Sequence, residues 1–347
     1  MSKKKYIQKL ACITLVFVTC FSQTVYAQEK PPVIKLEEAI RIAIERSNKI
    51  KVLKQEDSVI DIEQMAAAQS ADIMGWSAYD SLIVKQKNNG RMITLIQDKI
   101  KYEVEKAFNE INILEQEKVV LEKKVSVTTK DIAIMDIRNK SGLVNPIEYQ
   151  ASKTQLDETK SNLALKQAEI DKQKDYISTL IGYDIRRFDF EDTMNYESFK
   201  IIGIVDAYIE SKLDTVFWFD EQMLEVQKNN VVGDFPSSEV YARRKYDYVK
   251  GTYDLEDREK QYTQQLRDLY KSLTDMEEQI NVLSKQIEVI NQKIKVSEKY
   301  LEAGKISAHA YEKQLLEKEE LELNIQKLKS NYISTKSSIE QPWVILM

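Results

Sequence analysis

Glycine, proline, cysteine and histidine are all scarce in this chain. Its 347 residues include 8 glycines, 5 prolines, 2 cysteines and 1 histidine, whereas 31% of the residues are charged. So few helix breakers beside so many charges are typical of a protein built from long helices. Both cysteines, Cys12 and Cys20, lie within the first 20 residues. The rest of the chain therefore has no thiol for a disulfide, a metal site or nucleophilic catalysis.

The first 27 residues are typical of a targeting segment. Four lysines precede a short apolar run from Leu10 to Phe21, and the small residue Ala27 ends a cleavage-site pattern. The apolar run is too short to span a membrane comfortably. We therefore expect residues 1–27 to be a signal peptide and the protein to be exported to the cell envelope; lipid attachment at Cys20 is the less favoured alternative.

The charge balance limits the class of partner. Removal of the four lysines of the targeting segment takes the formal net charge from −5 to −9. A protein this acidic is a poor match for the phosphate backbone of a nucleic acid. We therefore expect no nucleic-acid partner.

The most regular stretch of the chain runs from Tyr262 to Leu301. Alternating steps of four and three residues meet an apolar side chain at eleven of twelve positions, and no glycine or proline intervenes. A seven-residue repeat of this kind predicts a long helix with a narrow apolar seam, packed against a partner helix of similar length. We expect the seam to consist of Leu266, Leu269, Leu273, Met276, Ile280, Leu283, Ile287, Ile290 and Ile294.

The same heptad phase recurs 162 residues earlier, from Ile100 to Asn139. Beyond the seam, the same offset pairs Gly142 with Gly304. Glycine at these positions is expected to end each helix, because it adopts the left-handed conformation without strain. Asn145 and Ser307 are residue types that begin the next helix. We therefore predict an internally duplicated chain with two antiparallel helical hairpins, whose tips lie at 142–145 and 304–307.

The remaining boundaries follow from apolar spacing and from glycine and proline. We expect a first structural repeat over 28–182, a connector over 183–203, a second repeat over 204–341 and a tail over 342–347. Inside the repeats, connectors are predicted over 75–90 and 229–251, between a shorter helix and each long one. The predicted fold class is all-α, with duplicated long antiparallel coiled-coil hairpins and little or no β-structure.

The sequence shows no pattern of catalytic residues. It lacks a glycine-rich phosphate loop, a GxSxG elbow and an HExxH motif. His309 has no nucleophile or orienting acid fixed nearby in the sequence, so a solvated turn residue is the preferred interpretation. Glu319 and Glu320 belong to a run of carboxylates that we expect to keep a helix soluble. We therefore predict no enzymatic activity, no cofactor and no metal site.

One segment, Tyr241 to Tyr248, combines aromatic and basic side chains. Aromatic rings with cationic neighbours suit a membrane surface or the peptidoglycan layer. Packing of this segment against the long helices is the favoured interpretation.

In the order of its elements, the chain resembles the TolC family of outer-membrane efflux proteins. The residues that carry the resemblance are Leu36-Glu37-Glu38-Ala39-Ile40 through Ile44-Glu45-Arg46-Ser47, Gly142-Leu143-Val144-Asn145-Pro146-Ile147, Leu180-Ile181-Gly182 and Gly304-Lys305-Ile306-Ser307. They are similar to the family's opening helix, first hairpin tip, mid-chain close and second tip. One departure is that 75–90 and 229–251 contain no pair of ten-residue alternating segments, as two membrane strands would require. The resemblance is therefore to a form that lacks the membrane β-barrel strands.

This resemblance implies a passive component of an efflux or export system. Such a protein would assemble as a trimer and form or dock onto a helical tunnel, with an adaptor and a cytoplasmic-membrane pump as partners, and insertion into a membrane is not expected. The residues implied to contact a partner are Gly142, Leu143, Val144, Asn145, Gly304, Lys305, Ile306 and Ser307. Because any helical hairpin needs similar residues to reverse, partner contact and simple chain reversal both stay open. An exported coiled-coil scaffold with no transport role is the alternative function.

Overall fold

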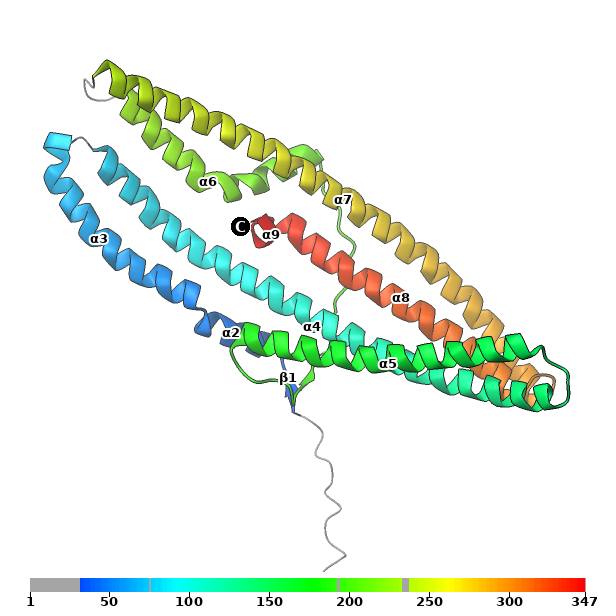
Figure 1. Ribbon diagram of the computed structural model, residues 1–347. Helices are drawn as coiled ribbons and strands as arrows, with labels where there is room; N and C mark the ends of the chain where they lie inside the picture. The colour runs from blue at the N-terminus through cyan, green and yellow to red at the C-terminus, as the bar shows by residue number, and fades with distance from the viewer. Residues whose placement is uncertain (1–31, 75, 192–193, 233–236, 347) are drawn as a thin grey trace, which may run out of the picture.

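A computed structural model describes residues 32–74, 76–191, 194–232 and 237–346, so the predicted signal peptide lies outside the described residues. The described residues form eight α-helices and two very short strands. They make an elongated molecule in which long helices run side by side (Figure 1), with most of the buried apolar residues in three clusters. The predicted all-α fold class, with two long antiparallel hairpins, is confirmed.

The two strands close the first half of the chain. β1 (Val33–Ile34) pairs in parallel with β2 (Asp189–Phe190), inside the segment expected to be a connector. Ile34 and Phe190 are buried beside the opening helix α2 (Leu36–Arg46) and the middle of α4 (Ser77–Lys140). The helical conformation is interrupted at Ser47, and α3 (Asn48–Met74) begins at the next residue.

The first hairpin consists of α4 and α5 (Pro146–Ile181). Gly142, with φ of +68°, ends α4 in the left-handed conformation, and the amide of Leu143 donates to the carbonyl of Arg138 at 2.9 Å. The side-chain oxygen of Asn145 accepts from the amide of Ile147 at 2.9 Å and caps α5. The backbone groups at this reversal are therefore satisfied by the turn itself.

The second hairpin follows the same rules. α6 (Val205–Val232) leads into α7 (Ser238–Glu302), and α8 (Ala308–Glu340) returns to the short α9 (Trp343–Leu346). Gly304 has φ of +65°, and Ser307 Oγ accepts from the amide of Ala310 at 3.1 Å. Both helix reversals thus occur where glycine and a capping side chain were found in the sequence.

The two connectors predicted within the repeats are mostly helix, which corrects their boundaries. α4 already begins at Ser77 and α7 at Ser238, so each long helix includes the glycine that suggested a connector. A single glycine such as Gly90 costs a helix only about 1 kcal/mol relative to alanine, too little to interrupt 64 residues. Gly251 has a packing reason, because a Cβ there would lie 2.8 Å from Cδ2 of Leu224 on α6.

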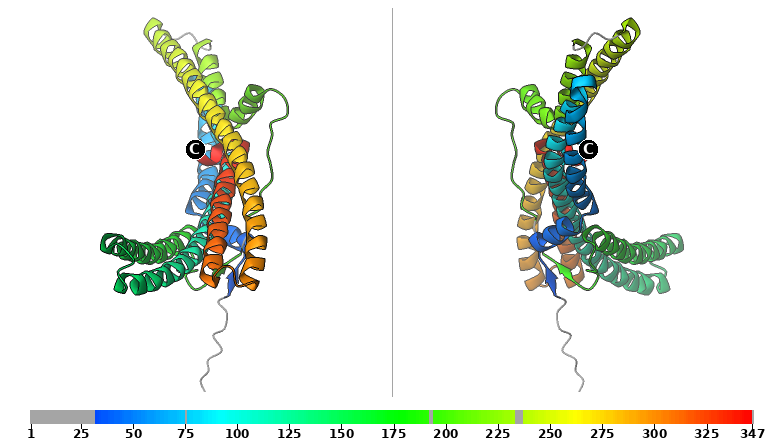
Figure 2. Two further views of the ribbon diagram at one scale, coloured as in Figure 1. Left: turned by 90° about the vertical axis from the view of Figure 1, so that its right-hand side faces the viewer. Right: turned by 90° about the vertical axis from the view of Figure 1, so that its left-hand side faces the viewer.

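The helices form open rows rather than a closed bundle. In the half that carries the tips, the main contacts place them in the order α5–α4–α8–α7, and in the other half the order is α3–α4–α6–α7. When the molecule is viewed from the end that carries the tips, the α4–α5 hairpin diverges from the α7–α8 hairpin (Figure 2). Across the described ranges, no helix carries an apolar stretch long enough to cross a bilayer.

Candidate functional site at the hairpin tips

Most of the seam predicted on α7 faces α8. Leu266, Leu273, Ile280 and Ile290 are buried, and the remaining predicted positions, Leu269, Met276, Leu283, Ile287 and Ile294, are half-buried. Leu273 and Ile280 form one buried cluster with Ile325, Tyr332 and Ile339 of α8. The second hairpin therefore joins through apolar side chains over most of its length.

In the first hairpin, ion pairs as well as apolar contacts join the two helices α4 and α5. Glu117 of α4 has a side chain that is only 14% exposed, and it pairs with Lys166 of α5 at 2.7 Å and with Lys327 of α8. Burial acts to raise the pKa of Glu117, but the hydrogen bonds and charges of Lys166 and Lys327 outweigh it and hold the pKa below its usual value. One carboxylate therefore links three helices.

A row of ion pairs continues toward the tips and joins α4 to α8. Lys123 meets Glu319 at 2.6 Å, and Lys124 meets Glu320 at 2.8 Å. These two carboxylates, expected only to keep a helix soluble, also join two helices, because each bridges to a lysine 196 residues away. No sequence signal revealed this pairing, since it depends on which helix lies next to α8.

The row ends at His309. Its Nε2 lies 2.7 Å from Oδ1 of Asp131 on α4, and its side chain is 16% exposed. Lys313 reaches the same Asp131 oxygen at 2.6 Å. Burial acts to raise the pKa of Asp131, but its hydrogen bonds to Lys313 and His309 dominate and lower the pKa. His309 is thus a link between hairpins, and its interpretation as a solvated turn residue is wrong.

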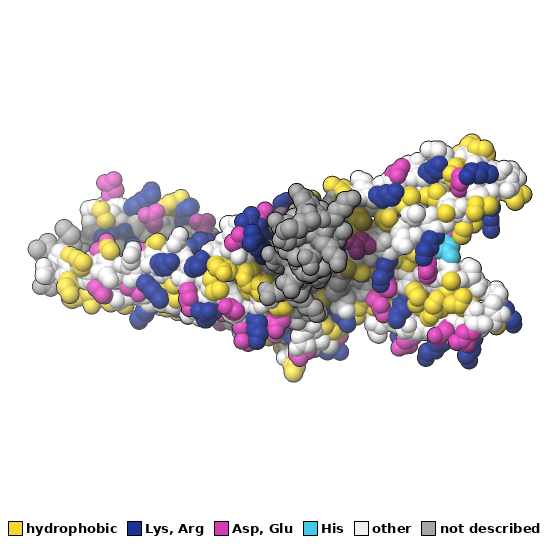
Figure 3. Space-filling view, turned by 90° about the horizontal axis from the view of Figure 1, so that it is seen from below, with side chains coloured by type: hydrophobic (Ala, Val, Ile, Leu, Met, Phe, Trp, Pro, Cys, Tyr) yellow, Lys and Arg dark blue, Asp and Glu magenta, His cyan; other side chains and the backbone are white. Residues whose placement is uncertain are grey.

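Beyond His309 the two tips separate into two arms, with the histidine at the base of the fork (Figure 3). The structure places the predicted tip residues on two separate arms. Leu143 is 75% exposed and Ile147 beside it is 77% exposed. On the second arm Gly304, Lys305 and Ser307 are exposed, while Ile306 on that arm and Val144 on the first are half-buried.

The tip residues divide into two kinds. Gly142, Gly304, Asn145 and Ser307 have backbone or capping roles that account for their identity. The side chain of Leu143 is not required by any of these roles. An exposed apolar side chain at the end of a projecting arm is available to a partner.

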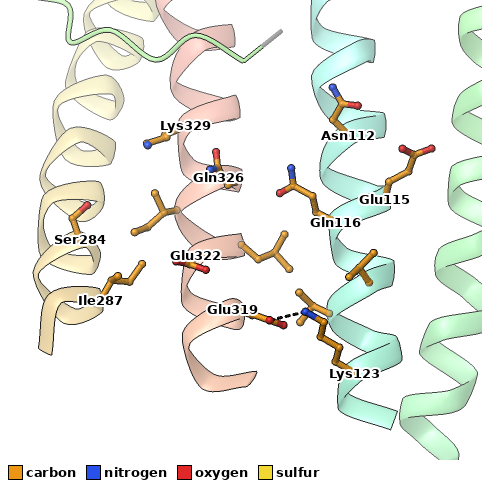
Figure 4. A pocket seen from close by; sticks show the side chains of 14 residues that line it. Asn112, Glu115, Gln116, Lys123, Ser284, Ile287, Glu319, Glu322, Gln326 and Lys329 are labelled. Carbon is orange, nitrogen blue, oxygen red and sulfur yellow. Dashed lines mark hydrogen bonds and ion pairs between the residues drawn. The ribbon is translucent and has the colours of Figure 1, made fainter. Parts of the chain in front are cut away.

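A groove of about 770 Å³ lies behind the fork, between α4, α7 and α8. Its wall combines amides such as Gln116 and Gln326 with aliphatic side chains such as Val120 and Leu323. Figure 4 shows these polar groups distributed along the groove, with the pair between Lys123 and Glu319 at one end. Ser284 in its wall donates to the carbonyl of Ile280 rather than to a base. Within the described ranges, no cluster of side chains is suited to hold a metal ion.

The aromatic and basic segment lies at the opposite end of the molecule from the tips (Figure 1). Tyr241 and Tyr246 are 43% and 57% exposed on the first turns of α7. The favoured interpretation, that this segment packs against the long helices, is therefore wrong for these two rings.

Comparison with known proteins identifies the fold. No protein-family model and no curated protein matches the sequence. A crystal structure of a membrane protein from Pseudomonas aeruginosa superposes with a TM-score of 0.67 at 9% identity, over 89% of this chain and 92% of that chain. CusC, studied for its transmembrane channel formation, gives 0.67 at 9% identity, over 93% and 95%.

VceC, an outer membrane protein of Vibrio cholerae, superposes with a TM-score of 0.58 at 12% identity, over 89% of this chain and 95% of that chain. The resemblance to the TolC family expected from the sequence is thus confirmed at the level of the fold. Identities this low establish the fold alone.

Proposed function

We propose that this protein is a non-enzymatic component of an envelope export system, which forms or docks onto a helical tunnel. The observation that carries the proposal is the fork (Figure 3), in which the two hairpins end in separate arms, and one arm presents Leu143 and Ile147 to solvent. The fold shared with channel proteins supports the same reading. Energy for transport would come from a partner, as the resemblance to the TolC family implies.

The proposed partners follow from the chemistry of the arms. A hairpin tip with apolar residues on a helical surface suits another helical hairpin, as in helix-in-groove recognition. We assign this role to an adaptor, itself coupled to a cytoplasmic-membrane pump. Three copies of this chain, exported to the cell envelope, would surround the tunnel.

Photo-crosslinking in cells that naturally produce the protein tests the partner contact. A photoreactive amino acid would replace Leu143 in one strain and Lys305 in another, and adducts would be identified by mass spectrometry. Ile202 is the matched control, because it is 99% exposed in the connector and remote from the tips. We expect the tip positions, and not position 202, to capture a protein with a long helical hairpin. Equal capture at all three positions would contradict the proposal.

Electron microscopy of the full chain purified from the envelope tests the tunnel. A ring-shaped oligomer with a central lumen is the expected particle. An elongated monomer or dimer without a lumen would instead support the alternative of an envelope scaffold.

A further inference from the structure

A cavity of about 360 Å³ lies between four helices in the half of the molecule away from the tips. Its wall is formed by α4, α6, α7 and α9, and Figure 1 shows the short α9 beside α4 and α6. Trp343 of α9 donates from Nε1 to Oδ2 of Asp98 on α4 at 3.1 Å, and Val344 is buried. These contacts fix α9 in place as one side of the cavity.

Most of the residues in the wall are apolar. Phe217 is buried, and its ring stacks on that of Tyr262 with the centroids 5.3 Å apart. The other apolar side chains in the wall are Met92, Leu95, Val216, Phe219 and Leu346. A concave, mostly apolar site of this size, with a few polar groups, is the usual form of a binding site for a small molecule.

Arg91 brings a positive charge into this wall without a counter-charge. Its side chain is half-buried, and its guanidinium lies over the ring of Trp218, 4.5 Å from the centroid. It donates to the carbonyl of Thr215 at 3.3 Å, and within the described residues it forms no ion pair. A guanidinium has five N–H donors, and stacking on a ring leaves its edge free to bind both oxygens of a carboxylate.

The second guanidinium in the wall is already neutralised. Arg258 pairs with Asp220 at 2.9 Å, and both residues line the cavity. Glu221 lies outside the wall, where burial and neighbouring carboxylates raise its pKa although the charge of Arg91 opposes this. The wall therefore carries one net positive charge, and an anion is the ligand that this charge favours.

A second polar group lies beside Arg91. Asn88 is three residues earlier on α4, so both side chains are on one face of the helix, and Asn88 also lines the cavity. Its half-buried carboxamide has no hydrogen-bond partner within the described residues. An amide N–H beside a guanidinium supplies a further donor to an anionic oxygen. Asp220 in the same wall repels a second negative charge on the ligand.

We infer that this cavity binds a monocarboxylate with an apolar body, whose carboxylate lies against Arg91 and Asn88 and whose tail packs among Met92, Leu95 and Phe219. The wall combines α4 of the first structural repeat with α6 and α7 of the second, so a bound ligand joins the two repeats and stabilises the folded chain. Because the cavity lies within one copy, binding there requires neither a tunnel nor a partner and is independent of the proposed function.

Calorimetric titration of the purified protein with decanoate, below the concentration at which decanoate forms micelles, tests the site. Decanol is the matched probe, because it has the same tail and no charge. We expect decanoate to bind at one site per chain, and decanol to bind at least about tenfold more weakly. Equal affinities for the two probes would show general apolar binding and overturn the inference.

Substitution of Arg91 locates the carboxylate. Arg91→Gln should weaken decanoate binding by at least about tenfold and leave decanol binding unchanged. Its matched control is Lys87→Gln, which removes one positive charge from an exposed side chain of the same helix, outside the wall. Lys87→Gln should leave both affinities unchanged. An equal loss in the two variants would show that only the net charge of the protein matters, and would contradict the site.

Two further variants test the site without removal of Arg91. Leu95→Trp fills the cavity and should abolish binding of decanoate and decanol alike. Asp220→Asn removes the negative charge of the wall and should strengthen decanoate binding about threefold or more. Circular dichroism checks that each variant is folded.

Two results would overturn the inference outright. Decanoate binding that survives both Arg91→Gln and Leu95→Trp would place decanoate elsewhere on the protein. Binding that appears only after removal of Met347 would show that the end of the chain itself occupies the cavity.

Discussion

The two hairpins have the same shape but are joined in different ways. Across the second hairpin, no ion pair links α7 to α8 within the described residues, and buried side chains such as Leu273 and Tyr332 fill the seam. Across the first, Lys174 meets Glu115 at 3.3 Å, and Lys118 donates to Gln167 at 2.7 Å. A single architecture therefore tolerates both an apolar and a charge-linked seam, and the two should respond differently to truncation, pH and salt.

Truncation of the apolar seam should have the largest effect. Leu273 is 1% exposed, and a buried leucine replaced by alanine loses transfer free energy and leaves a cavity. We expect Leu273→Ala to lower the free energy of unfolding by about 3 kcal/mol, measured by urea denaturation at fixed protein concentration. Val282→Ala, on the exposed face of the same helix, should cost under about 0.5 kcal/mol. Equal losses would show that the seam is not the main source of stability in this hairpin.

Loss of the Glu117 carboxylate, which Lys166 and Lys327 share, should cause the second-largest loss of stability. Glu117→Gln leaves Lys327 without its partner and Lys166 with Glu169 alone, and we expect a loss of about 1–2 kcal/mol. Its matched control is Glu122→Gln on the same helix, because Glu122 is 52% exposed and reaches Lys118 only at 3.9 Å. That exposed pair should cost about 0.5 kcal/mol or less. High salt should reduce the difference in unfolding free energy between wild type and Glu117→Gln. The corresponding difference for Leu273→Ala should change less.

Acid should weaken the first hairpin selectively. The folded-state pKa of Glu117 lies below its usual value, so below about pH 4.3 the unfolded chain binds more protons at this site than the folded chain does. The stabilisation by Glu117 is therefore fully present above that pH and is lost as the pH falls toward the folded-state pKa. We expect the difference in unfolding free energy between wild type and Glu117→Gln to shrink over this range. A difference that stays constant down to pH 2 would contradict this assignment.

The glycines that end α4 and α7 should show the smallest effect, and an equal one. Gly142→Ala and Gly304→Ala each place a Cβ at φ near +65°, with nothing within 4 Å to clash, so only backbone strain remains, about 1 kcal/mol each. Gly90→Ala is the control with the opposite sign, because Gly90 is helical with open space around it. It should stabilise α4 by about 0.5–1 kcal/mol. Thermal unfolding of the three variants measures the contrast.

Parts of this fold could be predicted from the sequence because helix periodicity and capping depend on residues close together in the chain. The seven-residue spacing indicated the face of α7 that is buried, and glycine with a capping residue marked both reversals, because these signals act within a few residues of chain. The same approach misplaced the connectors. It treated Gly90 and Gly251 as breaks, whereas Gly251 lies within α7 and packs against Leu224 of α6.

The sequence by itself determined that this chain forms long helices and where it turns back, since periodicity and capping are encoded by neighbours in the chain. Only the tertiary structure decided the order of the helices. That order brings Asp131 to His309 and Lys124 to Glu320. Contacts between residues nearly 200 positions apart depend on which helices become neighbours, and a repeat shared by every seam does not specify that choice.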